Sequence, residues 1–376
     1  MKFIFLYSSR GARNHNKWNS ELPAKSSMVQ NYISDGYAYV GDRLIEKDVV
    51  DEVLCFVEVG RGHGRIKISD KHTVYAIPYI TCIEPYIEPG DILFIRGCWK
   101  HWAEILHRYC KTNWMIYYGA GTPRSGWGCW HVVMYDFINK AKRGKLHLTV
   151  PFIKPIHYKV FYPMMGIKKE YDILLNSCFH IYDKKGQYKF VNAAVKYKEL
   201  YGENLKIAMP GGMYRNTHTS KMPQVIEKNK LDIYRPGTLS RPDLNELINK
   251  CLVYIHIGYG EQNARSALEA MRCNLPLYIA SPRLWPKFVS SNPQVTRICK
   301  NPNDYSSVAQ DIHQILADIK KGTFGIKCTE YFDSVNSPEI TVKQFEQLIT
   351  IMKRYSTPTL EKLQKDIEAR VKKESL

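Results

Sequence analysis

The distribution of hydrophobic positions along the chain predicts alternating strands and helices. Its clearest example lies in the C-terminal half, where residues 252–257 form a short apolar run of strand type. A turn with two glycines follows at 258–260, and residues 264–273 then predict a helix with one apolar side. Another strand is expected at 277–280. A tight turn of this kind leaves the first N–H groups of the helix free, and the helix dipole makes that end attractive to phosphate.

The same alternation runs through the first half of the chain. Helices are expected at 20–34 and 99–109, and the glycine-rich run 60–64 is interpreted as a hairpin turn, because it lacks the Lys-Ser/Thr ending of a phosphate loop. A first strand before a small-residue loop is typical of a nucleotide-type α/β domain, but the loop at Gly11 lacks Gly-x-Gly-x-x-Gly, so a bound dinucleotide is not supported. The strands are expected at 2–8, 49–59, 74–80, 91–95, 114–118 and 146–153.

The second half repeats this pattern after a linker. Prolines at 155 and 163 bar regular structure between them, so residues 154–163 are interpreted as an interdomain connection. Beyond Pro358, apolar positions at helical spacing mark an amphipathic helix whose other faces carry nearly balanced charge. The remaining elements are strands expected at 171–177, 205–209 and 231–234, and helices at 188–201, 243–249, 306–320 and 342–355.

Composition adds the size and the charge. At 376 residues, with 44% apolar and 24% charged residues, the chain is long enough for two soluble domains with separate cores. The net charge of +18 is spread along the chain, +7 before Pro155 and +11 from there on. This even spread argues against a dedicated nucleic-acid arm, and it fits a polyanionic ligand or an anionic membrane surface equally well.

Cysteine usage and the N-terminus point to one compartment. The ten cysteines form no Cys-x-x-Cys pair, and several lie in apolar strands, so reduced buried thiols are expected. The apolar run after Lys2 is too short for a signal sequence, and no run of about 18 apolar residues occurs. We therefore expect a cytoplasmic protein that either stays free or lies peripherally on a membrane.

Two carboxylates flank the predicted phosphate-binding helix. Glu261 precedes the helix and Glu269 lies inside it, followed by Ala-Met-Arg, a small residue and Asn-Leu-Pro. This Glu-x7-Glu pattern resembles the donor-site signature of family 4 glycosyltransferases, which are retaining enzymes of GT-B fold. The resemblance implies an α/β fold of two Rossmann-like domains facing a cleft, with a C-terminal helix that crosses back to the N-terminal domain. Two solvated glutamates at a helix start would give the same pattern.

The resemblance extends over roughly 170 residues and implies three segments. These are an acceptor-side domain at 1–158, a nucleotide-sugar (donor) domain at 159–345 and returning C-terminal helices at 346–376. Lys185 and Gly186 match the family's Lys-Gly, in which the cation binds the donor's diphosphate, although a plain surface lysine remains an alternative. The family's nearby arginine is replaced by Phe179 or His180. Its substitute is left open among Arg215, Arg265 and Arg124.

The resemblance also assigns roles to individual residues. It implies catalysis by Glu261 and Lys185, with Glu269 accepting hydrogen bonds from a diol, as acidic residues do for ribose. Arg124 is a further catalytic candidate, because it follows two glycines at a strand end and an arginine binds a phosphate or carboxylate in a bidentate way; a turn with a solvated arginine is the alternative. Loops at the strand ends of the first domain provide the expected acceptor side, namely Arg10, Gly11 and Trp127. Family members also carry a donor-contacting histidine near the level of His131, where a buried structural histidine is the alternative. The expected donor-binding residues are Gly260, Gln262, Asn263, Ala264, Arg265, His180, Gly211, Thr238, Leu239 and Glu269.

The implied reaction transfers a sugar from a nucleotide-diphosphate sugar to a hydroxyl of a glycan, glycoprotein or lipid-linked acceptor, with retention of configuration. No metal and no other cofactor is expected, since the chain has no Asp-x-Asp motif. Two alternatives keep the fold: transfer onto nucleic acid, which the even charge spread disfavours, and a non-catalytic sugar-nucleotide-binding module, which the missing arginine favours. An epimerase or phosphorylase would need residues that the sequence does not identify.

Overall fold

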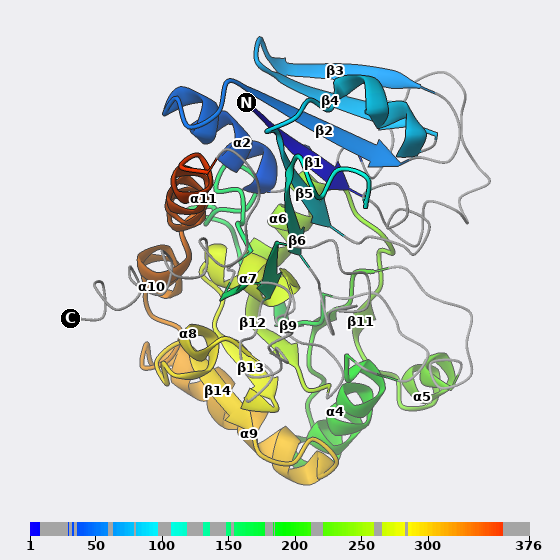
Figure 1. Ribbon diagram of the computed structural model, residues 1–376. Coiled ribbons are helices and arrows are strands. Elements are labelled where there is room, and N and C mark those ends of the chain that lie inside the picture. The colour runs from blue at the N-terminus through cyan, green and yellow to red at the C-terminus, as the bar shows by residue number, and fades with distance from the viewer. Residues whose placement is uncertain are drawn as a thin grey trace. The chain divides into compact units, whose positions relative to one another are not determined.

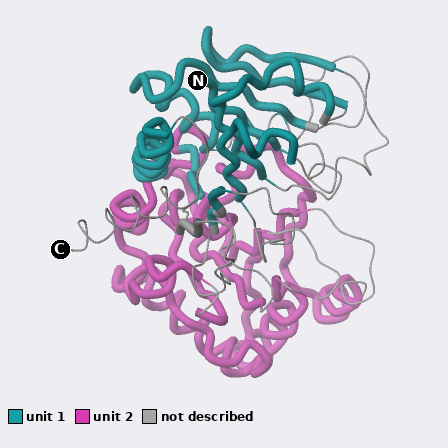
Figure 2. Tube along the Cα trace, viewed as in Figure 1, with its two compact units in different colours: residues 1–157, 338–376 teal, residues 158–337 magenta. Residues whose placement is uncertain are grey.

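The structure is a computed structural model, and it describes part of the chain in detail. The chain divides into two compact units, one formed by residues 1–157 and 338–376 and the other by residues 158–337 (Figure 2). The described residues are 1–7, 29, 32–33, 36–58, 63–78, 80–96, 107–118, 131–135, 148–151, 154–176, 183, 185–211, 221–258, 265–282 and 285–355.

The first unit is built on an eight-stranded sheet with the order β3-β4-β2-β1-β5-β6-β7-β8. Figure 1 labels the strands from β1 to β6. Neighbouring strands run parallel except for the pair β3 and β4. Tyr7, Arg96 and Tyr118 are partners in register, so the carboxyl ends of the central strands are level. The strands are β1 (Lys2–Tyr7), β2 (Glu52–Glu58), β3 (Gly64–Ser69), β4 (His72–Ile77), β5 (Ile92–Arg96), β6 (Trp114–Tyr118), β7 (Val132–Tyr135) and β8 (Leu148–Pro151).

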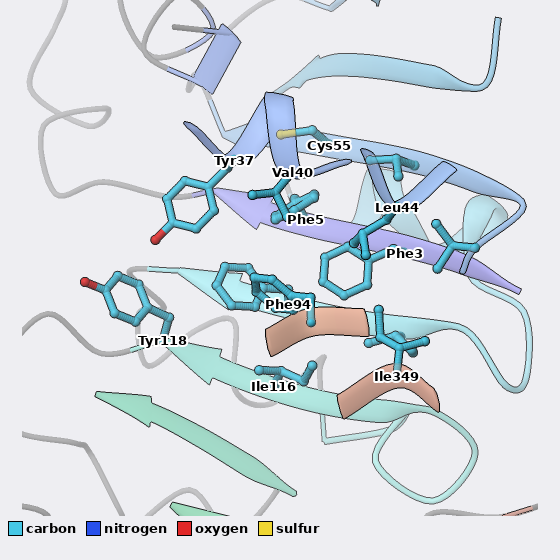
Figure 3. Close-up of a cluster of buried hydrophobic side chains, with 14 of the residues drawn as sticks. Phe3, Phe5, Tyr37, Val40, Leu44, Cys55, Phe94, Ile116, Tyr118 and Ile349 are labelled. Atoms are coloured by element: carbon cyan, nitrogen blue, oxygen red, sulfur yellow. The ribbon is translucent and has the colours of Figure 1, made fainter. Parts of the chain in front are cut away.

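Alternation along the central strands divides the core of this unit between the two faces of the sheet. Phe3, Phe5 and Phe94 pack on one face with α2 (Gly36–Glu46) and α11 (Pro338–Met352), as Figure 3 shows. Ile4, Leu6, Leu93 and Ile95 point to the other face, toward the 3-10 helix η2 (Ile80–Tyr86). Because α11 supplies core residues, the chain returns to the first unit after completing the second.

One local prediction for this unit is wrong. A hairpin turn was expected at 60–64 between the strands predicted at 49–59 and 74–80, but the strands found there, β2 and β4, pair in parallel, which excludes a hairpin between them. The hairpin instead joins β3 to β4 through Asp70 and Lys71. The strand β3 was not predicted; intermediate and exposed residues alternate along it, as in an edge strand with one open face.

The second unit has a six-stranded parallel sheet with the order β11-β10-β9-β12-β13-β14. Its strands are β9 (Tyr171–Leu174), β10 (Ile207–Ala208), β11 (Ile233–Tyr234), β12 (Cys251–His256), β13 (Leu277–Ala280) and β14 (Thr296–Cys299). Its helices are α4 (Gln187–Tyr201), α5 (Met222–Lys228), α6 (Arg241–Asn249), α7 (Arg265–Arg272), α8 (Lys287–Ser290), α9 (Tyr305–Lys320) and α10 (Cys328–Asn336). Strands alternating with crossover helices on a parallel sheet confirm the predicted α/β class.

Core residues of this unit come from the strands and from two long helices. Phe190, Val191 and Ala194 of α4 and Val308, Ile312 and Ile315 of α9 are buried in one cluster with strand residues. In the described part of the chain no helix combines the length and apolar character needed to cross a bilayer. The helix predicted beyond Pro358, most of the one at 20–34 and most of the one at 99–109 lie outside the described residues.

The packing of α11 predicts a stability effect. Phe345 is fully buried, and its ring makes edge contacts with Phe3 and Phe94, each at a centroid distance of 5.4 Å. We expect Phe345→Ala to lower the free energy of unfolding of the first unit by about 3–5 kcal/mol, because it removes buried ring area and leaves a cavity. Urea unfolding measures this change. The control is Lys343→Ala on the exposed side of α11, which should change stability by less than about 0.5 kcal/mol; equal effects of both would contradict the packing.

Candidate functional site

A tight glycine contact brings two predicted site segments together in the second unit. Gly186 precedes α4 with φ +80°, and a Cβ added to it would lie 2.6 Å from the backbone N of Gly258 and 2.7 Å from the carbonyl C of Ile257. Only glycine fits there without strain, because the backbone itself is the obstacle. The Lys185-Gly186 turn therefore lies against the residues that follow β12. This is the carboxyl end of a central parallel strand, where open α/β sheets bind ligands.

The start of α4 is closed by a carboxylate of the chain itself. Asp183 accepts hydrogen bonds from the backbone N–H groups of Tyr188 at 2.9 Å and Lys189 at 3.2 Å. Burial raises the pKa of Asp183, and these two hydrogen bonds oppose the shift. Since Asp183 satisfies these N–H groups, positive charge for a phosphate ligand beside this turn has to come mainly from side chains such as Lys185.

A buried histidine lies at the end of β12, next to this turn. His256 is 1% exposed, and its ring makes a T-shaped contact with Trp285 at a centroid distance of 5.3 Å. Burial and the positive charge of Lys185 lower the pKa of His256 to about 3. The imidazole is therefore neutral at pH 7, and Lys185 lies close enough to influence it electrostatically.

The second predicted carboxylate is held between two arginines. Glu269 is 3% exposed on α7, and its Oε1 accepts hydrogen bonds from Nε of Arg265 at 2.9 Å and from Nη1 of Arg241 at 3.2 Å. Arg265 lies one helical turn before Glu269, whereas Arg241 is the first residue of α6. The pairing argues against a solvated glutamate, because exposure is low and both partners are charged.

Three further predicted donor residues lie at the ends of neighbouring strands. The N–H group of Gly211, beyond β10, donates to the carbonyl of Gly237, beyond β11, at 2.7 Å. Thr238 is exposed and Leu239 is partly exposed, and both lead directly into α6. These residues share the carboxyl edge of the sheet with Gly258, as parallel strands require.

His131 is a structural histidine. Its Nδ1 accepts a hydrogen bond from the backbone N–H of Met115 at 3.0 Å, and its ring packs against Trp114 at 5.2 Å. Burial lowers the pKa of His131 to about 4. The structure thus favours the alternative in which this residue belongs to the packing of the first unit.

The remaining predicted residues lie outside the described part of the chain, and their roles stay predictions. They are Glu261, Gly260, Gln262, Asn263, Ala264, His180, Phe179, Arg215, Arg124, Arg10, Gly11 and Trp127. Among the residues that the structure describes, no group of three or more His, Cys, Asp or Glu side chains is placed to hold a metal ion.

Sequence reasoning missed Asp183, Arg241 and His256. For Asp183 a signal existed, since an acidic residue shortly before a helix is a frequent cap. Arg241 follows a capping serine at the start of α6, a position where an exposed cation is the ordinary expectation. His256 ends an apolar strand, and only the packing of Trp285 and Lys185 shows its surroundings.

Comparisons with known proteins agree with this architecture. Residues 166–323 match the family model described as glycosyl transferases group 1. Three similar solved structures cover over nine-tenths of this chain at low identity, which shows a shared GT-B fold. Sucrose-phosphate synthase from Thermosynechococcus elongatus has 13% identity, covers 92% of this chain and 98% of its own, and gives a TM-score of 0.67.

The other two structures carry further information in their names. A trehalose-6-phosphate synthase, studied for glycosyltransfer with retention, has 12% identity, covers 94% and 99% of the two chains and gives a TM-score of 0.64. The Anabaena protein HepE in complex with UDP and glucose has 12% identity, coverage of 93% and 99%, and a TM-score of 0.57. Comparison with curated proteins by sequence gives no match.

The glycine contact predicts a difference between the two ends of α4. Gly186 and Gly202 flank this helix with φ +80° and +72°, but a Cβ at Gly202 meets no atom within 4 Å. Gly202→Ala should cost about 1–2 kcal/mol for the left-handed backbone alone. Gly186→Ala should cost a further 1–3 kcal/mol, because its Cβ collides with backbone. Urea unfolding of both variants measures the difference, and equal losses would show that the turn is not pressed against Gly258.

The buried histidine predicts a dependence of stability on pH. An unfolded chain protonates histidine near pH 6.5, whereas the pKa of His256 in the folded protein is about 3. Between these values the unfolded state binds more protons, so the free energy of unfolding falls as the pH falls, by up to about 1.4 kcal/mol per pH unit. Urea unfolding of the wild type and of His256→Asn from pH 7 to pH 5 measures this term. The stability difference between them should shrink toward pH 5, and a constant difference would contradict it.

Proposed function

Because residues 166–323 match the group 1 glycosyl transferase model and the fold is GT-B, we propose that the chain is a glycosyltransferase. It moves a sugar from a nucleotide-diphosphate sugar to a hydroxyl of a glycan or glycoconjugate. The observation that carries this proposal is the contact of the Lys185-Gly186 turn with Gly258. This contact supports a role for Lys185 at the carboxyl edge of the second sheet, where the chain continues beyond Gly258 toward α7.

Lys185 supplies charge for the leaving group in this proposal. A departing nucleoside diphosphate gains negative charge at the transition state, and a positioned cation stabilises that charge more strongly in a site shielded from water. The neutral His256 beneath the turn does not add a competing positive charge at physiological pH. Lys185 therefore acts mainly on turnover.

Glu269 supplies binding of the nucleotide. A buried carboxylate accepts O–H donors strongly, and a ribose offers two neighbouring hydroxyls. The two arginines that hold Glu269 keep this acceptor in one place. HepE, which shares the fold, is described with UDP and glucose, which supports a nucleotide sugar as the donor.

Retention, the acceptor class and the compartment complete the proposal. Resemblance of the Glu-x7-Glu segment to family 4, together with the retaining trehalose-6-phosphate synthase of the same fold, supports a product that keeps the donor's anomeric configuration. The acceptor is a glycan hydroxyl, free or on a glycoprotein or lipid-linked carrier. The described cysteines are free thiols, which supports a reducing compartment, and we place the reaction in the cytoplasm.

Two substitutions separate binding from turnover. We expect Glu269→Ala to weaken nucleotide binding roughly tenfold to hundredfold, since it removes an acceptor of charge-assisted hydrogen bonds. Lys185→Ala should leave binding less affected and lower kcat by about 10²–10³, because it removes a cation from the leaving group. Thermal shift with a panel of nucleotide sugars, followed by calorimetry and product assays on the donor that binds, measures both effects.

The control for Lys185 is Lys196→Ala, which removes an exposed lysine of α4 that pairs with Glu199 at 2.5 Å. It should change neither binding nor turnover. Wild-type behaviour of both site variants would disprove the assigned site. Tight donor binding with no turnover on any glycan acceptor would instead establish the non-catalytic module.

A further inference from the structure

Arg241 links two helices through the carboxylate expected to bind ribose. Its Nη1 lies 3.2 Å from Oε1 of Glu269, whose side chain is 3% exposed, while the side chain of Arg241 is 27% exposed. Arg265 approaches the same oxygen with Nε at 2.9 Å. In the described part of the chain, these two hydrogen bonds to Glu269 both end on Oε1 and not on Oε2.

A second contact fixes the guanidinium of Arg241. Its Cζ lies 5.8 Å from the centroid of the Phe161 ring, and Phe161 is fully buried. The segment that follows Phe161 is tied to α6, since the N–H of Tyr162 donates to Asn245 Oδ1 at 3.1 Å and that of Met164 donates to Asn249 Oδ1 at 2.8 Å. Arg241 is thus held by an aromatic face on one side and by a carboxylate on the other.

Two arginines on one oxygen restrict the orientation of the carboxylate. A carboxylate on a helix rotates about its last torsion with little resistance, because this torsion is broad. Bonds from two different backbone positions, one on α6 and one on α7, remove that freedom. Oε2 then has a fixed direction, which is the condition for selecting a ligand with hydroxyls in one arrangement.

We propose that Arg241 is a positioning residue that sets the preference of the site for ribose over deoxyribose. This proposal rests on the proposed function, in which Glu269 takes the hydroxyls of the donor's ribose. Arg241 holds Oε1, so Oε2 accepts a hydrogen bond from the ribose diol. A nucleotide that lacks one hydroxyl loses that bond, and the fixed carboxylate does not turn to recover it.

The competing explanation of the same contacts is that Arg241 is a staple, a residue that only holds α6 and α7 together. It predicts that loss of Arg241 lowers stability and weakens the binding of all nucleotides by the same factor. The positioning role predicts a change in the ratio of two affinities, which a general loosening of the helices leaves untouched. The experiment therefore compares ribonucleotides with deoxyribonucleotides.

Calorimetry with UDP and 2′-deoxy-UDP, and with the ADP and GDP pairs in parallel, measures this ratio in the full-length protein. We expect the wild type to prefer the ribonucleotide by about tenfold or more, the usual effect of one hydrogen bond to a charged group. Arg241→Gln should reduce the preference to about threefold or less, mainly by weakening the ribonucleotide. Arg241→Lys keeps the positive charge, and it should retain part of the preference. If Arg241→Gln does not fold, the lysine variant provides the measurement.

The matched control is Arg272→Gln. Arg272 also belongs to α7, its side chain is 11% exposed, and it pairs with Asp333 of α10 at 3.1 Å rather than with Glu269. This variant should lose stability and keep the full ribose preference. Glu269→Gln should lose the preference, and adding Arg241→Gln to it should cause no further loss, because both act through one carboxylate.

The outcomes separate this proposal from the function on which it rests. A wild type that binds none of the nucleotides overturns both. Loss of preference in Glu269→Gln with full preference in both Arg241 variants overturns the positioning role alone. Equal weakening of ribonucleotide and deoxyribonucleotide by Arg241→Gln makes Arg241 a staple and likewise overturns it.

Discussion

The site of the second unit depends on one close backbone contact, between Gly186 and the residues that follow β12. A peptide group fills the space that a side chain at 186 would need, so α4 begins directly against the end of a central strand. This approach sets the position of Lys185 at the sheet edge, and Asp183 fixes the first turn of α4 with hydrogen bonds to two backbone N–H groups. Without the close approach of Gly186, Lys185 and the end of β12 would not lie at the same edge of the sheet.

The same edge shows how charges are arranged around a buried acid. A carboxylate with 3% exposure would be costly alone, since burial removes its hydration. Arg241 and Arg265 offset that cost with charged hydrogen bonds, and breaking either leaves part of it uncompensated. The arrangement also leaves more positive than negative charge near the carboxylate, which suits a site for an anionic ligand.

Prediction from sequence succeeded where the local pattern was long and unambiguous. The strand 114–118 was expected where β6 lies, and the helix expected at 188–201 is α4. The edge strand β3 was missed because only one of its faces is covered, and the short helix α5 has too few buried residues to give a periodic signal. Lys185-Gly186 was found from a family motif. Arg241 was not, because its partner Glu269 lies 28 residues away and meets it only in the folded chain.

The two units differ in whether one continuous stretch of the chain forms them. Residues 158–337 form one uninterrupted unit, whereas the first unit uses residues on both sides of it. The aromatic core around Phe3 and Phe94 includes Phe345, so it stays incomplete until α11 has been made. During synthesis from the N-terminus, the second unit is therefore available to fold first, and the first unit completes its core last. Cleavage of the chain between residues 157 and 158, or between residues 337 and 338, leaves the second unit whole. Neither cleavage yields a fragment with the complete first unit.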